Sequence, residues 1–142
     1  RLGADIIETR CVDSSQPDEL LTDTADAVLV DAPCSGLGIL RRKPDIKYFR
    51  TESDIESLAR TGYGILENSS RYVKKGGFIV YSTCTIDGRE NGAVTQKFLE
   101  NHRNFVKVPI DCVNVENDGD LTLFPNVHGC DGFYICKMQR ID

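Results

Sequence analysis

The chain alternates between short apolar runs of strand length and longer stretches whose apolar residues recur at helical spacing. Two β-branched runs, residues 27–31 and 78–83, each lead into polar residues and a cysteine. Such runs are typical of buried parallel strands, and they predict that Cys34 and Cys84 lie at the carboxyl ends of two strands. Ligands of open α/β sheets bind at that edge, so we expect both thiols in a functional site.

Two helices are expected beside these strands. Residues 51–75 carry apolar or small side chains at helical spacing, and Ser53 and Glu56 form a capping-box signature near their start. The basic and glycine residues 74–77 resemble a last helical turn and its C-cap. Residues 89–102 predict a second helix, with apolar residues on one side.

Gly62 and Gly64 lie inside the first of these predicted helices. A glycine at such a position costs roughly 1 kcal/mol relative to alanine. One explanation for this cost is that the helix packs closely on the sheet at these two positions.

The ends of the chain predict further strands. Residues 5–12 form a short strand candidate, and the polar piece 16–23 follows, with Pro17 placed to start a helix. Near the other end, residues 105–110 and 132–138 are strand-like and predict an antiparallel pair at the edge of the sheet. The connection between them is rich in Asn, Asp and Gly. No repeat or linker divides the chain, so we predict one α/β domain.

Composition and net charge indicate the class of protein and the partners that it can bind. Hydrophobic residues make up 40% of the 142 residues and charged residues 27%, and no segment is apolar for long enough to span a membrane or to form a signal core. We therefore expect a cytoplasmic globular protein without membrane partners. The net charge of −5 gives no overall attraction for nucleic acid. The basic run 41–50 is either a solvated loop or a local contact to nucleic acid.

The six cysteines show no C-x-x-C spacing, which argues against a zinc ribbon or a redox pair, and we expect no metal site. Cys11 and Cys136 lie in apolar strand patterns and are expected to be buried. Cys112 and Cys130 lie in polar sequence that assigns them no role.

Four segments together resemble one enzyme family. In chain order they are Asp31-Ala-Pro-Cys-Ser-Gly36, Arg41-Arg-Lys-Pro-Asp45, Tyr81-Ser-Thr-Cys-Thr85 followed by Glu90-Asn91, and Asp131-Gly-Phe133. In this order they resemble the RNA 5-methylcytosine methyltransferases of the Sun-domain family, and the likeness covers essentially the whole chain. It is strongest to the bacterial members that act on 16S rRNA.

The resemblance implies a class I S-adenosylmethionine-dependent methyltransferase, with a Rossmann-like sheet that carries an antiparallel strand near its carboxyl terminus. It implies S-adenosylmethionine as cofactor and RNA, specifically 16S rRNA, as substrate. The family's glycine-rich cofactor loop and N-terminal RNA-binding domain have no counterpart in the sequence. Residues 1–142 are therefore expected to form the C-terminal part of one catalytic domain, inactive by itself.

Methyl transfer to carbon 5 of cytosine requires activation of the ring, because this carbon is a poor nucleophile. A thiolate that adds to the neighbouring ring carbon supplies it. By the resemblance, Cys84 is this nucleophile and Cys34 assists release of the product. The opposite assignment stays open, because DNA cytosine methyltransferases use the cysteine of a Pro-Cys motif as nucleophile.

Charged residues also have expected roles. Asp31 ends its strand directly before Pro33 and Cys34, where its carboxylate would hold the amino group of cytosine or the methionine end of the cofactor, although a turn or helix cap is an alternative role. Asp13 matches the family's acidic contact to the adenine amino group. The residues expected to contact RNA belong to the basic loop: Arg41, Arg42, Lys43 and Pro44.

Two other functions are alternatives. A non-catalytic RNA-binding fragment is consistent with the missing cofactor loop. A methyltransferase acting on amino groups is disfavoured, because such enzymes carry Pro-Pro and an aromatic residue where this chain has Pro33 and Cys34.

Overall fold

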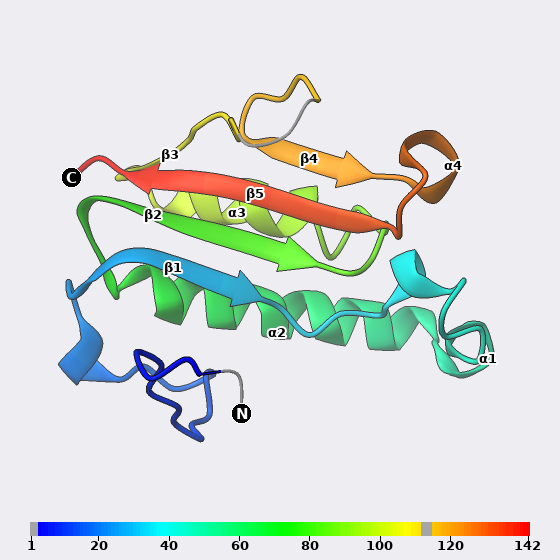
Figure 1. Cartoon of the computed structure of the whole chain (residues 1–142), viewed down its shortest axis with the longest axis horizontal. Helices are drawn as coiled ribbons and strands as arrows, with labels where there is room; N and C mark the ends of the chain where they lie inside the picture. The colour runs from blue at the N-terminus through cyan, green and yellow to red at the C-terminus, as the bar shows by residue number, and fades with distance from the viewer. Residues whose placement is uncertain (1–2, 112–114) are drawn as a thin grey trace.

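The structure, a computed structural model, describes residues 3–111 and 115–142. A five-stranded sheet has the order β1-β2-β5-β3, and β4 also pairs with β5 (Figure 1). The elements in chain order are η1 (Glu19–Leu21), β1 (Ala25–Asp31), η2 (Leu37–Ile39), α1 (Ile46–Phe49), α2 (Glu52–Ser70), β2 (Val73–Thr83), α3 (Gly92–Asn101), β3 (Phe105–Lys107), β4 (Asp120–Leu123), α4 (Pro125–His128) and β5 (Phe133–Arg140).

The two strands predicted to precede the cysteines pair in parallel, as expected. β1 and β2 are in register from Ala27, opposite Phe78, to Asp31, opposite Ser82, and α2 forms the crossover between them. Their carboxyl ends therefore meet at one edge of the sheet. The α/β prediction is confirmed.

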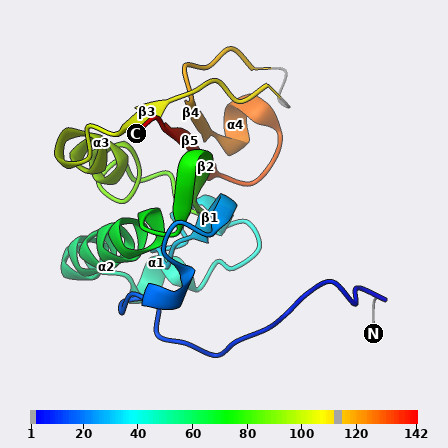
Figure 2. The same cartoon turned by 90° about the vertical axis from the view of Figure 1, so that its left-hand side faces the viewer.

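The two long helices, α2 and α3, cover the same face of the sheet (Figure 2). The core between them contains Leu66, Ile79, Tyr81, Val94, Phe98, Tyr134, Cys136 and Met138. The prediction that Cys136 is buried is thus confirmed. On the other face, Leu29 of β1 remains 71% exposed. Both cysteine-bearing strands were predicted to be buried. For β1 this prediction is correct only on the face that the helices cover.

The long helix differs from its prediction at both ends. Its N-cap is Thr51, which forms a capping box with Asp54, rather than the predicted pair at Ser53 and Glu56. The helix ends at Ser70, and residues 74–77 belong to β2 instead of to a last turn. Buried Val73 already pairs with Ala25, so strand pairing takes over where helix continuation was predicted.

Of the two glycines in α2, only Gly62 meets the sheet closely. A Cβ atom at Gly62 would lie 2.7 Å from the hydroxyl oxygen of Tyr81 in β2, whereas a Cβ at Gly64 would meet nothing within 4 Å. Close packing on the sheet thus explains why a glycine stands at position 62, but it does not explain the glycine at position 64.

The predicted strand at residues 5–12 is wrong, because these residues form no strand. They pair with no strand of the part of the chain described here, and their apolar side chains face solvent, with Ile6 93% exposed. The expectation that Cys11 is buried is wrong for the same reason. The following piece packs on the far end of α2, where Asn68 donates a hydrogen bond to the carbonyl of Ser15.

The carboxyl-terminal part contains the predicted antiparallel pair, and adds a strand that was not predicted. β3 pairs with the second half of β5 and β4 with its first half, so β5 lies between them and β2 rather than at the edge. β4 lies in the connection expected to be a loop, and Cys112 lies outside the described residues. Within the described ranges, no helix has the length and apolar character needed to cross a bilayer.

Candidate active site

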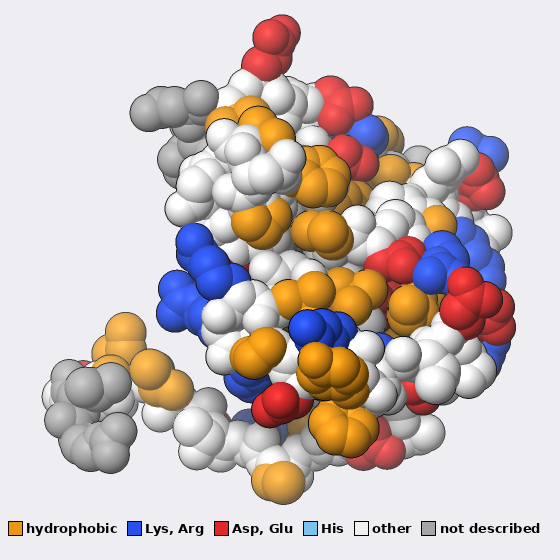
Figure 3. Space-filling model, turned by 90° about the vertical axis from the view of Figure 1, so that its right-hand side faces the viewer, with side chains coloured by type: hydrophobic (Ala, Val, Ile, Leu, Met, Phe, Trp, Pro, Cys, Tyr) orange, Lys and Arg blue, Asp and Glu red, His pale blue; other side chains and the backbone are white. Residues whose placement is uncertain are grey.

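Cys34 and Cys84 meet at the carboxyl ends of β1 and β2, as the sequence predicts. Their sulfur atoms lie 3.3 Å apart, and both side chains are partly buried. Cys34 lies three residues beyond the end of β1, and Cys84 follows β2 directly. Figure 3 looks onto the end of the molecule at which β1 and β2 finish in Figure 1.

Buried Glu90 holds the Cys34 loop in place. Its carboxylate accepts a hydrogen bond of 2.7 Å from the backbone N–H of Ser35 and a second from the Ser35 hydroxyl. The hydroxyl groups of Ser35 and Thr85 are themselves 2.9 Å apart. The residues that follow the two cysteines are therefore joined directly through their hydroxyl groups, and the Glu90 carboxylate, which is 1% exposed, holds Ser35 in this position.

Asn91 fixes the residues on either side of Cys84. Its side-chain oxygen accepts a hydrogen bond of 2.6 Å from the Thr83 hydroxyl, and its side-chain nitrogen donates to the carbonyl of Thr85 at 3.0 Å. The sequence contains Glu90-Asn91 as part of a motif but assigns neither residue a role. The available signal was a carboxylate and an amide just before an amphipathic helix and just after a cysteine motif.

The ionisation of Cys34 depends on its surroundings and on Cys84. Burial, together with a hydrogen bond to the Cys84 thiol, raises the pKa of Cys34 to about 12. Cys34 therefore keeps its proton near neutral pH. A protonated thiol at this distance can donate a hydrogen bond to the Cys84 sulfur when the latter is a thiolate.

The two predicted acidic residues occupy different places. Asp31 lies exposed at the end of β1, three residues before Cys34, and accepts a hydrogen bond of 3.2 Å from the Ser82 hydroxyl. Asp13 belongs to the segment that packs on the last turn of α2, and hydrogen bonds from Ser15 lower the pKa of its carboxyl. The structure brings Asp31 to the cysteine edge and does not bring Asp13 there.

The basic loop is fastened to the start of β5. Arg41 and Arg42 both pair with Asp131, the first at 3.0 Å, and the side chain of Asp131 is 9% exposed. Lys43 and Pro44 are exposed. Asp131 thus positions the loop, and the arginine side chains remain 62% and 72% exposed beside the cysteine edge.

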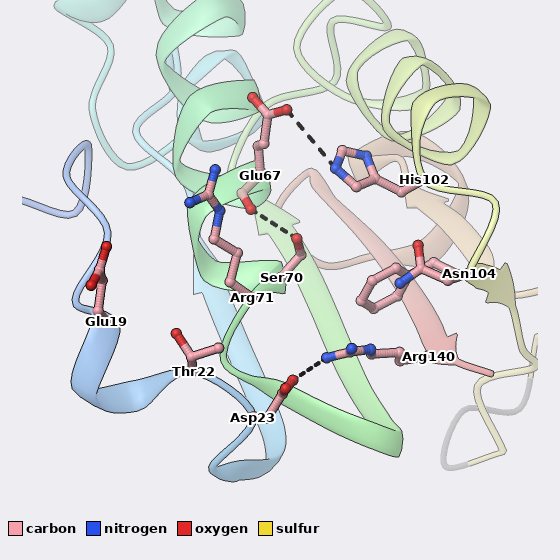
Figure 4. A pocket seen from close by; sticks show the side chains of 10 residues that line it. Glu19, Thr22, Asp23, Glu67, Ser70, Arg71, His102, Asn104 and Arg140 are labelled. Carbon is pink, nitrogen blue, oxygen red and sulfur yellow. Dashed lines mark hydrogen bonds and ion pairs between the residues drawn. The ribbon is translucent and has the colours of Figure 1, made fainter. Parts of the chain in front are cut away.

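A pocket of about 510 Å³ lies at the opposite end of the molecule (Figure 4). Glu67 points toward His102 at 3.9 Å, and Arg140 pairs with Asp23. Glu67 belongs to the last turns of α2, whereas Arg50, which lies two residues before the start of that helix, contacts the Cys34 loop. Within residues 3–111 and 115–142, no cluster of three His, Cys, Asp or Glu side chains is arranged to hold a metal ion.

Comparison with known proteins decides the family. Residues 1–139 match the family model described as 16S rRNA methyltransferase RsmB/F. The chain belongs to the RsmB/F family. It is 40% identical, over 99% of its length, to the probable ribosomal RNA small subunit methyltransferase B of Bacillus subtilis. It is also 40% identical, over 99% of its length, to the ribosomal RNA small subunit methyltransferase B of Yersinia enterocolitica.

The fold of the chain is also similar to that of a solved structure. The crystal structure of NSun6 from Pyrococcus horikoshii, solved with SFG, superposes with a TM-score of 0.81 at 27% identity, over 99% of this chain and 36% of that one. The resemblance to the Sun-domain family and its methyltransferase fold is thus confirmed. The chain spans about a third of the length of the curated relatives it matches, 33% for the B. subtilis protein and 32% for the Yersinia protein.

Proposed function

We propose that this chain is the C-terminal part of the catalytic domain of an S-adenosylmethionine-dependent enzyme that methylates carbon 5 of a cytosine in 16S rRNA. The observation that carries the proposal is the pair of thiols 3.3 Å apart at the carboxyl ends of two parallel strands. Membership of the RsmB/F family supports methylation of rRNA. The paired thiols add a chemical reason for choosing carbon 5.

In the proposed reaction, the thiolate of Cys84 adds to carbon 6 of the cytosine, which makes carbon 5 nucleophilic. S-adenosylmethionine supplies a methyl group bound to a positively charged sulfur. As carbon 5 bonds to this methyl, the bond from methyl to sulfur breaks and S-adenosylhomocysteine is released. The proton on carbon 5 then passes to water, and the bond between carbon 6 and the Cys84 sulfur breaks. Cys34 donates a hydrogen bond to the departing Cys84 thiolate and so assists release.

The described residues fit part of a cofactor site. Asp31 presents an exposed carboxylate at the cysteine edge, where it can accept hydrogen bonds from the cytosine amino group or from the amino group of the cofactor's methionine end. The NSun6 structure contains SFG, an analogue of S-adenosylmethionine, which supports the choice of cofactor. Asp13 enters the proposal as an adenine contact through the family resemblance alone, because its segment packs on the far end of α2.

RNA would approach along the basic loop. Arg41, Arg42 and Lys43 are exposed beside the cysteines, while Pro44 restricts the backbone that carries them. Phosphate groups are the partners that such cations favour. A target base must leave its stack to reach the thiols, which unpaired RNA permits at least cost.

The test uses the longer protein that contains this chain, 16S rRNA and methyl-labelled S-adenosylmethionine. Nucleoside mass spectrometry should detect 5-methylcytidine, whereas the 142-residue chain alone should transfer no methyl group. Label on the amino group or the ribose would contradict the proposed position. RNA binding by the longer protein without any methyl transfer would instead support the alternative, a non-catalytic RNA-binding protein.

A further inference from the structure

Two neighbouring aromatic side chains project into solvent at the cysteine end of the molecule. Tyr48 and Phe49, on the short helix α1, are 73% and 77% exposed. Figure 3 shows hydrophobic side chains at the surface of this end, beside Lys and Arg side chains. Adjacent, exposed aromatic rings are costly in water and indicate a contact surface.

Helix α1 is fastened directly to the Cys34 loop at both of its ends. At one end, the Cδ1 atom of Ile46 lies 2.9 Å from the position that a Cβ atom on Gly36 would occupy. At the other end, the guanidinium of Arg50 donates a hydrogen bond of 3.2 Å to the carbonyl of Ser35. Gly36 and Ser35 lie within two residues of Cys34, so the aromatic pair is held near the thiols.

The charge around the pair is strongly positive. Residues 41–50 contain five cations and one acid, Asp45, in a chain whose net charge is −5. Arg41 and Arg42 are paired with Asp131, whereas Lys47 and Arg50 flank the rings and are exposed. The ammonium of Lys47 lies 4.8 Å from the centre of the Tyr48 ring.

We propose that Tyr48 and Phe49 form a stacking platform for unpaired RNA bases that flank the target cytosine, with Lys47 on the adjoining phosphate. The proposal rests on the proposed function and extends it to two aromatic residues of the basic run 41–50 to which the sequence assigns no role in RNA binding. Aromatic rings accept any base by stacking, and adjacent cations hold the backbone. A base leaving its stack to reach the thiols exposes its neighbours, and the platform replaces the stacking that they lose.

Fluorescence anisotropy of the longer protein with a labelled single-stranded RNA containing one cytosine tests the platform. Tyr48→Ala and Phe49→Ala should each weaken binding by about fivefold to a hundredfold, whereas Tyr48→Phe should bind as the unmodified protein does. The matched control is Leu20→Ala, since Leu20 is 84% exposed on η1 at the far end of the molecule. Unchanged affinity in both alanine variants would overturn the proposal.

RNAs with one abasic position next to the cytosine separate stacking from charge. With the base removed at the stacking position, Tyr48→Ala or Phe49→Ala should cause no further loss. Lys47→Gln should lower the slope of log affinity against log salt by about 0.7, and the aromatic substitutions should leave that slope unchanged. Equal losses on intact RNA and on every abasic RNA would contradict stacking.

Two further readouts distinguish this proposal from the proposed function. If the unmodified protein forms 5-methylcytidine while both alanine variants bind RNA normally, the platform is wrong and the enzyme assignment stands. If the unmodified protein self-associates in sedimentation and the double alanine variant does not, with RNA affinity unchanged, the aromatic surface binds a second copy and the RNA platform is overturned.

Discussion

The sulfur atoms of Cys34 and Cys84 lie 3.3 Å apart although 50 positions separate the two residues in the chain. Two parallel strands bring them together, and the buried side chains of Glu90 and Asn91 fix the residues next to each thiol. This arrangement makes the reactivity of one thiol depend on the other.

Cys34 should react slowly with iodoacetamide near neutral pH, because burial and the Cys84 thiol raise its pKa to about 12. A raised pKa means that the neutral thiol is favoured in the folded state. Its contribution to stability is therefore fully present below the ordinary pKa of 9.0 and is lost as the pH rises toward about 12.

Peptide mass spectrometry should show alkylation of Cys34 rising through that pH range, with exposed Cys11 as the internal reference. At a given pH, Cys84→Ala should speed alkylation of Cys34, because the hydrogen bond that the Cys34 thiol donates to Cys84 and the charge of Cys84 both raise the pKa of Cys34. Rapid alkylation of Cys34 near neutral pH in the unmodified chain would show that the thiol is not held protonated.

Glu90→Ala should destabilise the chain by about 1–3 kcal/mol, because the buried N–H of Ser35 loses its acceptor and the Ser35 hydroxyl keeps only Thr85 as a partner. Glu90→Gln keeps one acceptor and should cost less. Equilibrium unfolding in urea measures these losses. Glu100→Ala, an exposed position on α3, is the matched control and should change stability by less than about 0.5 kcal/mol. A loss at Glu90 no larger than that at Glu100 would contradict the role given to the buried carboxylate.

Gly62→Ala and Gly64→Ala should change stability in opposite directions. A methyl group at Gly62 would lie 2.7 Å from the hydroxyl oxygen of Tyr81, which donates a hydrogen bond to the carbonyl of Glu90. We expect a loss of about 1–3 kcal/mol there. At Gly64 nothing lies within 4 Å, and the better helix propensity of alanine should stabilise by up to about 1 kcal/mol. Thermal unfolding of both variants tests the contrast, and a stabilised Gly62→Ala would disprove the close packing.

The sequence was sufficient to predict how the cysteines meet, because apolar runs of strand length determine parallel strands and each motif follows its strand directly. It was insufficient where the outcome depends on a distant partner. Residues 5–12 have the pattern of a strand, but a strand forms only with a neighbour, and these residues pair with none in the described chain. β4 shows the opposite case. Its sequence is that of a polar connection, yet it forms a strand because β5 supplies its hydrogen-bond partners.

The ion pairs of the basic loop could not be predicted from the sequence either. The interaction of Arg41 and Arg42 with Asp131 spans about 90 residues, so the basic loop looked fully free to bind phosphate. The exposure of Tyr48 and Phe49 could not be predicted either, because an aromatic pair beside apolar Ile46 is as typical of a core as of a surface.

The most direct measurement compares Cys34→Ala with Cys84→Ala in the longer protein, incubated with 16S rRNA and S-adenosylmethionine and separated on a denaturing gel. We predict a covalent RNA adduct that accumulates in Cys34→Ala, because release is impaired, and that never forms in Cys84→Ala, because the nucleophile is missing. An adduct in Cys84→Ala that is absent from Cys34→Ala would reverse the two roles. Absence of an adduct from both variants, with no methyl transfer by the unmodified protein, would contradict the covalent mechanism.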